Sequence, residues 1–150
     1  MRVSLVVCAL ALAILVAGCG SSEQISTQPA ASDRDRDALA SALNTWEAQG
    51  SSYTITYTAT CGDGPFFTDV PITVDVDDGN AVISDGSDTG IDLVTVEFLF
   101  EMIESALVEG ADSVAVSYAE EGIPTSVDID WDANSVDDEF CVDISSFDLN

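Results

Sequence analysis

The chain has 150 residues, of which 28 are Asp or Glu and only three are Arg, with no Lys or His, so its formal net charge at pH 7 is −25. Binding to nucleic-acid phosphates and docking onto anionic lipid both require clustered basic side chains, so the composition excludes both. The absence of Lys and His also removes the usual general bases and Schiff-base nucleophiles of enzymes.

Residues 1–18 have the pattern of a cleavable export signal. Arg2 precedes an apolar stretch, Val3 to Val16, which is too short to span the roughly 30 Å hydrocarbon core of a bilayer. The sequence Val16-Ala17-Gly18-Cys19 then resembles the bacterial lipobox, in which small residues flank the cut and the cysteine receives lipid. We expect Cys19 to anchor the protein, through lipid alone, to the extracytoplasmic side of a cell membrane or an outer membrane. An ordinary export signal followed by a chance cysteine is the alternative.

The chain after the export signal divides into a tether and one domain. Residues 19–32 comprise the lipidated Cys19 and a flexible tether rich in Gly, Ser, Gln, Thr, Ala and Pro. Residues 33–150 are enough for one domain with one core. All acidic residues follow Cys19, and self-repulsion at this density destabilises a compact state unless salt screens it. We therefore expect a saline natural environment and a thermal midpoint that rises with NaCl.

Two cysteines belong to this domain, Cys61 and Cys141, because Cys8 leaves with the export signal. An even pair in an oxidising compartment predicts a disulfide, with two free thiols or a thiolate metal site as the alternatives. A regular last strand turns Cys141 away from the face on which Cys61 would lie. A bulge, or a position of Cys61 beyond the end of its strand, would allow the two to meet.

The first half of the domain predicts a helix followed by three strands. Apolar residues recur at helical spacing within residues 33–49, and Gly50 supplies a helix stop. Alternating patterns predict strands at residues 52–61, 70–76 and 81–84, and Thr occupies the solvated face of the first one. The Asp78-Gly79 pair between the last two predicts a type I′ hairpin.

The second half repeats this order. A helix is predicted from the N-cap Thr95 to Glu109, ended by Gly110, and strands follow at residues 114–118, 126–131 and 139–144, with an extension toward Phe147. The order αβββ therefore occurs twice, which suggests an internal duplication. We expect an α+β domain with an antiparallel sheet of about six strands and both helices on one face.

A set of short motifs resembles an uncharacterised family of bacterial secreted proteins and lipoproteins that is known only as a domain of unknown function. In chain order the motifs are Trp46, Tyr53-Thr-Ile-Thr-Tyr57, Cys61, Val74-Asp-Val-Asp-Asp-Gly79, Thr95-Val-Glu-Phe-Leu-Phe100, Val114-Ala-Val-Ser-Tyr118, Gly122-Ile-Pro124, Asp128 and Asp137-Asp-Glu139. The resemblance implies an extracytoplasmic α+β domain and brings no known activity. Members of that family usually carry Cys-x-Cys after the first strand, whereas Asp63 occupies the second position here. The partner of Cys61 is therefore expected to be displaced to Cys141.

The acidic segment from Asp128 to Glu139 has the spacing of a Ca²⁺-binding EF-hand loop. Asp128, Asp130, Asp132 and Glu139 occupy positions 1, 3, 5 and 12 of such a loop. Position 6, which requires Gly for a sharp turn, is Ala133, and the flanking residues have strand patterns. The alternative is a solvated strand face from which alternate Asp side chains point outward.

These observations favour a non-enzymatic interaction or envelope-associated domain with an unknown protein or small-molecule partner and no cofactor. A Ca²⁺-responsive binding module, using the four carboxylates above, is the rival hypothesis. A hydrolase that uses a carboxylate pair is a third, although 28 acidic residues make close pairs expected by chance. The Phe66-Phe67 pair, after a Gly- and Pro-containing loop, is a candidate exposed contact.

Overall fold

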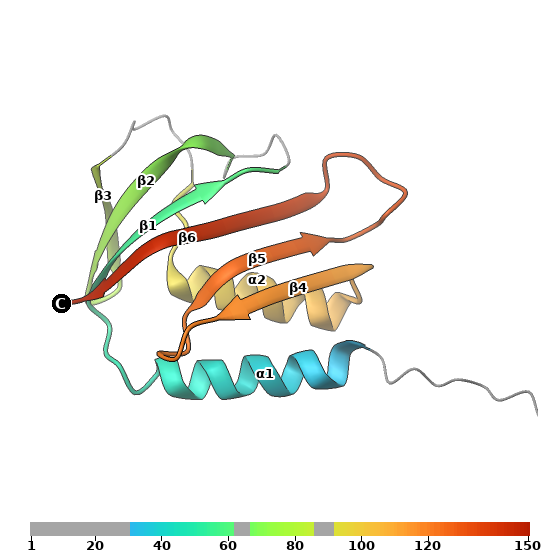
Figure 1. Ribbon diagram of the computed structural model, residues 1–150, viewed down its shortest axis with the longest axis horizontal. Helices are drawn as coiled ribbons and strands as arrows, with labels where there is room; N and C mark the ends of the chain where they lie inside the picture. Colours follow the sequence, from blue (N-terminus) through green and yellow to red (C-terminus); the bar gives the residue numbers. More distant parts are fainter. Residues whose placement is uncertain (1–30, 62–66, 86–91) are drawn as a thin grey trace, which may run out of the picture.

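The computed structural model describes residues 31–61, 67–85 and 92–150 (Figure 1). Two helices and six strands follow one another in the predicted order αβββαβββ, which confirms an α+β domain with an antiparallel six-stranded sheet. The elements are α1 (Ala31–Trp46), β1 (Tyr53–Ala59), β2 (Thr68–Asp77), β3 (Asn80–Asp85), α2 (Val96–Glu109), β4 (Ser113–Tyr118), β5 (Pro124–Asp130) and β6 (Glu139–Leu149).

The strand order in the sheet is β3-β2-β1-β6-β5-β4. Two meanders, β1-β2-β3 and β4-β5-β6, are joined where the first strand of the domain pairs with the last one. This β1–β6 pairing joins the two meanders into one open sheet and brings together the first and last strands of the domain. The two halves occupy different places, since β1 is central whereas β4 lies at an edge. The duplication stays a prediction.

Helix α1 differs from the predicted helix at residues 33–49, because it begins at Ala31 and ends at Trp46. After Trp46 the chain tightens into a turn in which the N–H of Gln49 donates to the Trp46 carbonyl at 2.8 Å. Bonds between residues three apart are typical of helix ends. Gly50, with φ of 119°, lies four residues after the end of the helix, so the prediction that it directly stops the helix is wrong.

Strand β1 alternates strictly between a buried and a half-buried face, as its sequence predicts. On the outer face Thr54 donates to an Asp75 carboxylate oxygen at 2.8 Å, and the hydroxyls of Thr56 and Thr73 lie 2.9 Å apart. These cross-strand pairs satisfy the polar face without salt bridges. The largest fully enclosed side chains of the core come from the sheet, from α2 and from residues beside these elements: Tyr53, Tyr57, Ile55, Ile72, Leu99, Ile103, Ile123, Ile129, Val74, Val94, Val96 and Val127.

Two tyrosines of β1 bind the chain where α2 begins. The N–H of Val94 donates to the Tyr57 hydroxyl at 3.3 Å, and the N–H of Val96 donates to the Tyr53 hydroxyl at 3.0 Å. The side chain of Thr95 caps the helix, as predicted. Because the first N–H groups of a helix have no partner within it, these bonds fix the N-terminus of α2 to the middle of the sheet.

A bulge in β6 changes which residues face the core. Thr56 of β1 pairs with Ser146, whereas Tyr57 pairs with Ile144, so Ser145 has no partner opposite it. Its hydroxyl donates to the Thr56 carbonyl at 3.2 Å. A bulge adds one residue to a strand and shifts the alternation beyond it. Strand β6 therefore continues to Leu149, past the end that its sequence pattern predicts.

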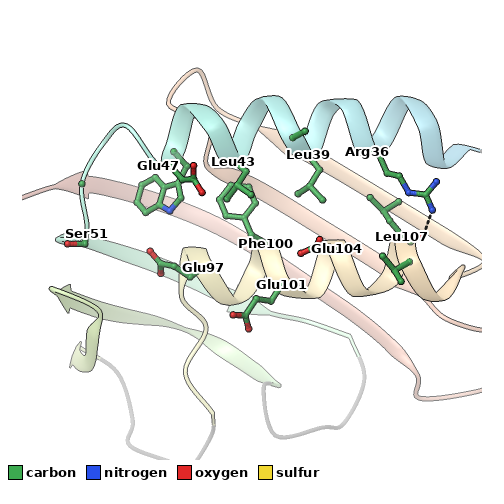
Figure 2. Close-up of a pocket in the computed structure, with 14 residues that line it drawn as sticks. Arg36, Leu39, Leu43, Glu47, Ser51, Glu97, Phe100, Glu101, Glu104 and Leu107 are labelled. Carbon is green, nitrogen blue, oxygen red and sulfur yellow. Dashed lines mark hydrogen bonds between the residues drawn. The ribbon is translucent and has the colours of Figure 1, made fainter.

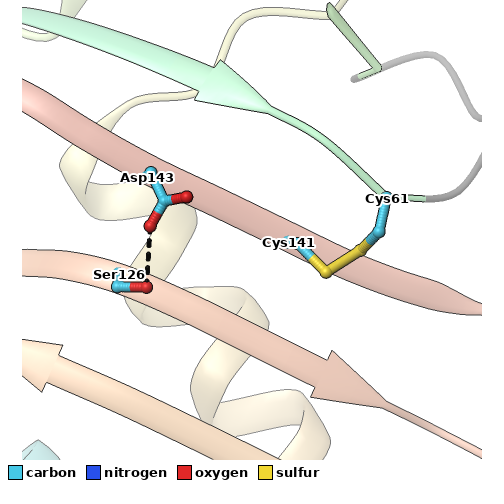
Figure 3. The surroundings of a disulfide bond; sticks show 4 residues. All are labelled: Cys61, Ser126, Cys141 and Asp143. Atoms are coloured by element: carbon cyan, nitrogen blue, oxygen red, sulfur yellow. Dashed lines mark hydrogen bonds between the residues drawn. A yellow bond between two sulfur atoms is a disulfide. The ribbon is translucent and has the colours of Figure 1, made fainter. Parts of the chain in front are cut away.

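The predicted disulfide between Cys61 and Cys141 is confirmed (Figure 3). The two Cα atoms are 5.2 Å apart. Strand β1 ends at Ala59, so Cys61 lies beyond the strand end and reaches the outer face, on which Cys141 lies. The N–H of Thr60 donates to the Cys141 carbonyl at 3.1 Å and holds the two segments together.

The β4–β5 hairpin approaches α1 too closely at Gly122 for a side chain. A Cβ there would lie 2.4 Å from the Ala42 carbonyl oxygen and 2.9 Å from the Thr45 Cβ, and φ is +85°. We expect Gly122→Ala to lower the free energy of unfolding by roughly 3 kcal/mol, because a left-handed backbone and overpacking each cost about 1–3 kcal/mol. Gly110→Ala is the matched control, with φ of +81° and no atom within 4 Å of the added Cβ. Equal losses in urea unfolding of the two variants would contradict the close approach.

No helix among residues 31–61, 67–85 and 92–150 is both long and apolar enough to cross a membrane.

Candidate functional site

A groove of about 730 Å³ lies between the antiparallel helices α1 and α2 (Figure 2). We call it the interhelix groove. Arg36 and Leu107 lie at one end of it, and Glu47 and Glu97 lie at the other. The volume falls within the range of small-molecule sites in proteins. The apolar lining residues are Leu39, Ala40, Leu43, Trp46, Phe100, Leu107 and Val108.

Helical periodicity places these apolar side chains between the helices. Leu39 and Leu43 are four residues apart on α1, and Phe100 and Leu107 are seven apart on α2, so each pair lies on one face of its helix. Leu39, Phe100 and Leu107 are buried. Val108, which is 71% exposed, lies at the margin of the groove. The groove therefore has a packed apolar floor and an open apolar margin.

Four carboxylates surround this floor. Glu47 follows α1, and Glu97, Glu101 and Glu104 recur along α2 at helical spacing, all with exposed side chains. The only basic side chain among the lining residues that the structure describes is Arg36. The rim of the interhelix groove is therefore negatively charged overall, and its negative charge is greatest away from Arg36.

Arg36 closes one end of the groove by capping α2. Its guanidinium donates to the Leu107 carbonyl at 2.7 Å and also lies 3.6 Å from the Asp33 carboxylate. The last carbonyls of a helix have no partner within it, and a cation there is favoured by the helix dipole. One of the few basic residues of the chain is thus used to join the two helices.

A buried aromatic cluster supports the opposite end. The ring of Trp46 lies edge-on to Tyr53, with centroids 5.1 Å apart, and Phe147 lies 5.7 Å from both rings. The Tyr53 hydroxyl donates to Glu97. Burial, followed by this bond to a carboxylate, raises the pKa of Tyr53 well above its ordinary value. Tyr53 therefore remains a neutral donor that orients the Glu97 carboxylate at the end of the groove.

The groove is lined mainly by apolar and charged side chains. Ser51 carries the sole hydroxyl among its described lining residues, and this hydroxyl donates to the Asp78 carboxylate at 3.4 Å. The remaining lining groups are apolar side chains, carboxylates and one guanidinium. Apolar side chains can hold a ligand by desolvation, and the charged groups can hold it by electrostatic attraction.

The four predicted Ca²⁺ ligands lie on the β5–β6 hairpin, but they do not form one group. Asp128 is exposed on the outer face, and Asp130 lies opposite Glu139. Asp132 Oδ1 accepts hydrogen bonds from the backbone and side-chain nitrogens of Asn134, both at 3.0 Å. In the part of the chain that the structure describes, no three Cys, Asp or Glu side chains are grouped so that they could hold a metal ion. The Ca²⁺ site stays a prediction.

Carboxylates crowd this hairpin. Burial, and then the negative charges of Asp138, Glu139 and Asp112, raise the pKa of Asp130. Within residues 31–61, 67–85 and 92–150, the enclosed Oδ1 atoms of Asp130 and Asp138 have no hydrogen-bond partner. Hydrogen bonds from the following loop residues, by contrast, lower the pKa of Asp132. Burial and then charge repulsion thus raise the pKa at the strand end, whereas local hydrogen bonds lower the pKa in the loop.

Two other predicted features stay predictions. Cys19 lies outside the described residues, so its lipidation stays a prediction. Phe66 also lies outside them, whereas its neighbour Phe67 is 42% exposed. A contact role for this aromatic pair stays a prediction as well.

The interhelix groove is not predicted by the sequence patterns. Those patterns assign Leu39, Leu43 and Phe100 to apolar stripes that cover the sheet, and the structure places them along the contact between the two helices. A usable signal does exist in the sequence: Glu97 and Glu101 recur beside the apolar stripe of α2, although a solvated helix face gives the same pattern.

Comparison with known proteins identifies a family. The family model described as "Family of unknown function (DUF6174)" matches residues 38–149, which comprise nearly all of the folded domain. No curated protein and no solved structure matches the chain. Because the match covers most of its length, the chain belongs to the family of unknown function DUF6174.

Proposed function

We propose that this protein is a non-enzymatic binding domain, lipid-anchored outside the cytoplasm, and that its ligand occupies the interhelix groove. The observation that carries the proposal is a groove of about 730 Å³ with an apolar floor and a few charged groups at its rim. A well-formed apolar pocket with a small number of convergent polar groups is the usual form of a ligand site.

The anchor in this proposal is supported by Cys19 and its surroundings in the sequence. The apolar export signal, the small residues before the cysteine and the Gly-, Ser- and Pro-containing composition after it all fit lipid attachment. The disulfide between Cys61 and Cys141 fits an oxidising compartment. Fractionation of cells that produce Cys19→Ser tests the anchor, and a variant that stays in the membrane fraction would overturn it.

We also infer that both helices cover the same face of the sheet. The support comes from Tyr53, whose buried side chain contacts Trp46 at the end of α1 and bonds to Val96 at the start of α2. One face of β1 therefore meets both helices. The internal duplication is the corresponding proposal for the chain as a whole, supported by the repeated order of elements.

If the ligand occupies the groove, a bulky residue at Ala40 should weaken its binding. Ala40 is exposed and lines the groove, so Ala40→Trp should fill space without disturbing the core. We expect the neutral fluorophore N-phenyl-1-naphthylamine to bind the wild type saturably and the variant at least about tenfold more weakly, a loss of about 1.4 kcal/mol. Fluorescence titration measures both affinities.

Ala48→Trp is the matched control, because Ala48 is exposed in the turn after α1 and does not line the groove. This control should bind the fluorophore like the wild type. Thermal unfolding of all three proteins verifies that they remain folded under the titration conditions. No saturable binding to the wild type, or equal affinities in all three proteins, would overturn the proposed site.

A further inference from the structure

The interhelix groove combines two features that select for a particular ligand chemistry. Its floor includes the aromatic residues Trp46 and Phe100 together with Leu39, Leu43 and Leu107. Aromatic and aliphatic side chains favour an apolar body, and aromatic rings also attract a cation that lies over their faces. The lining therefore accommodates an apolar group and adds some affinity for positive charge.

The rim supplies the stronger selection, by charge. Four carboxylates belong to it, and Arg36 is the single opposing charge. A charge that is partly removed from water interacts more strongly with its neighbours than it does in solution. An anionic headgroup in this groove would be repelled along α2, whereas a cationic headgroup would gain a carboxylate partner.

The two ends of the groove differ, which gives the ligand a direction. Glu47 and Glu97 lie across from each other at the end where α2 begins (Figure 2). Arg36 occupies the opposite end, where its guanidinium is already bonded to the Leu107 carbonyl. A positive headgroup is therefore favoured between the two glutamates, with its apolar part pointing toward Leu107.

We infer that the interhelix groove binds an amphiphilic organic cation, an amine or quaternary ammonium compound with an apolar tail. This inference rests on the proposed binding function and adds the ligand class to it. The recognising groups are the carboxylates of the rim and the aromatic and aliphatic floor. Neutral amphiphiles lose the charge interaction, and anionic amphiphiles meet repulsion.

Competition against N-phenyl-1-naphthylamine tests this inference on the full chain. The competitors are dodecyltrimethylammonium, dodecyl maltoside and dodecyl sulfate, each below its micelle concentration, so the tail is constant and the headgroup charge varies. About 0.5 M NaCl shortens the Debye length to roughly 4 Å and suppresses attraction to the acidic surface in general. We expect the cation to displace the fluorophore at a concentration at least about tenfold lower than either other amphiphile.

Two double variants separate the rim from the overall charge. Glu47→Gln/Glu97→Gln removes the two rim carboxylates between which the headgroup is placed, and Glu120→Gln/Glu121→Gln removes the same charge from the β4–β5 turn, outside the groove. The advantage of the cation should fall at least about fivefold in the first variant and stay unchanged in the second.

The outcomes distinguish this inference from the function on which it rests. Equal displacement by all three amphiphiles, with the fluorophore still lost in Ala40→Trp, would overturn the ligand class and leave the binding site in place. An equal loss in both double variants would also overturn it, because the preference would then be a property of the whole surface. Absence of fluorophore binding would overturn the proposed site itself.

Discussion

Replacing Cys61 and Cys141 together by Ala is expected to lower the free energy of unfolding by about 4–5 kcal/mol. The bridge joins residues 80 positions apart, so it removes a large part of the chain entropy of the unfolded state. Both cysteines are only half-buried, so their loss leaves no large cavity. Because small domains are stable by about 5–15 kcal/mol, the change is a large share of the total. Urea unfolding followed by circular dichroism, at a fixed high NaCl concentration, measures it.

Reduction provides an internal control for this prediction. Dithiothreitol should destabilise the wild type by about the same amount and leave the double variant unchanged. An unfolding midpoint that is the same in the double variant and the wild type would show that the bridge does not constrain the unfolded chain.

Raising the pH above 10 is expected to unfold the protein cooperatively. Burial raises the pKa of Tyr53 and of Tyr57 above the value near 10 that tyrosine has in an unfolded chain. Above that pH the unfolded chain releases protons that the folded protein retains, so the stability present below pH 10 is lost as the pH rises toward the folded pKa values. The free energy of unfolding then falls by about 1.4 kcal/mol per pH unit for each of the two tyrosines, which is about 2.7 kcal/mol per pH unit for both.

The composition makes this titration unusually clear. With no Lys and no His, the three tyrosines are the main side chains that titrate between about pH 9 and 12. Burial, with the charge of Asp35 as a second cause, raises the pKa of the third, Tyr118, to about 12. Tyrosinate absorbance at 295 nm should therefore appear together with the loss of the circular dichroism signal.

A variant checks which residue is responsible. Tyr57→Phe should reduce the pH dependence of stability above pH 10 by about 1.4 kcal/mol per pH unit, since one titrating group is removed. The slope is the informative quantity, because the variant also loses the hydrogen bond from the Val94 N–H and starts from a lower stability. Reversible ionisation of all three tyrosines near pH 10 in a folded protein would contradict the prediction.

Local chemistry explains why the secondary structure could be predicted from the sequence. The alternation of Tyr53, Ile55 and Tyr57 with threonines has a period of two, which fits only a strand with one buried face. Thr95 and Gly110 mark the two ends of α2 because a helix terminus needs a side-chain acceptor at its start and a left-handed residue after its end. Each signal involves neighbours in the chain, so no tertiary information was needed.

The sequence predicted the disulfide, but only the tertiary structure shows how its two cysteines meet. The number of cysteines and the export signal indicated that Cys61 and Cys141 should pair, but strand alternation placed them on opposite faces. The exact end of β1 at Ala59 resolves this, because Cys61 is then free of the alternation of the strand. Pairing partners, and not residue type, determine where a strand ends.

The sequence by itself determined the order of the helices and strands, the negative charge and the set of reactive side chains, which includes no His and no Lys. Only the tertiary structure decided the pairing of β1 with β6, the bulge at Ser145 and the interhelix groove. The physical reason is that periodicity shows which side of a helix or strand is apolar, but not which other apolar side it meets. The same stripe of α2 is therefore both the cover of a sheet and one wall of a groove, and the position of α1 decides which of its residues a ligand can reach.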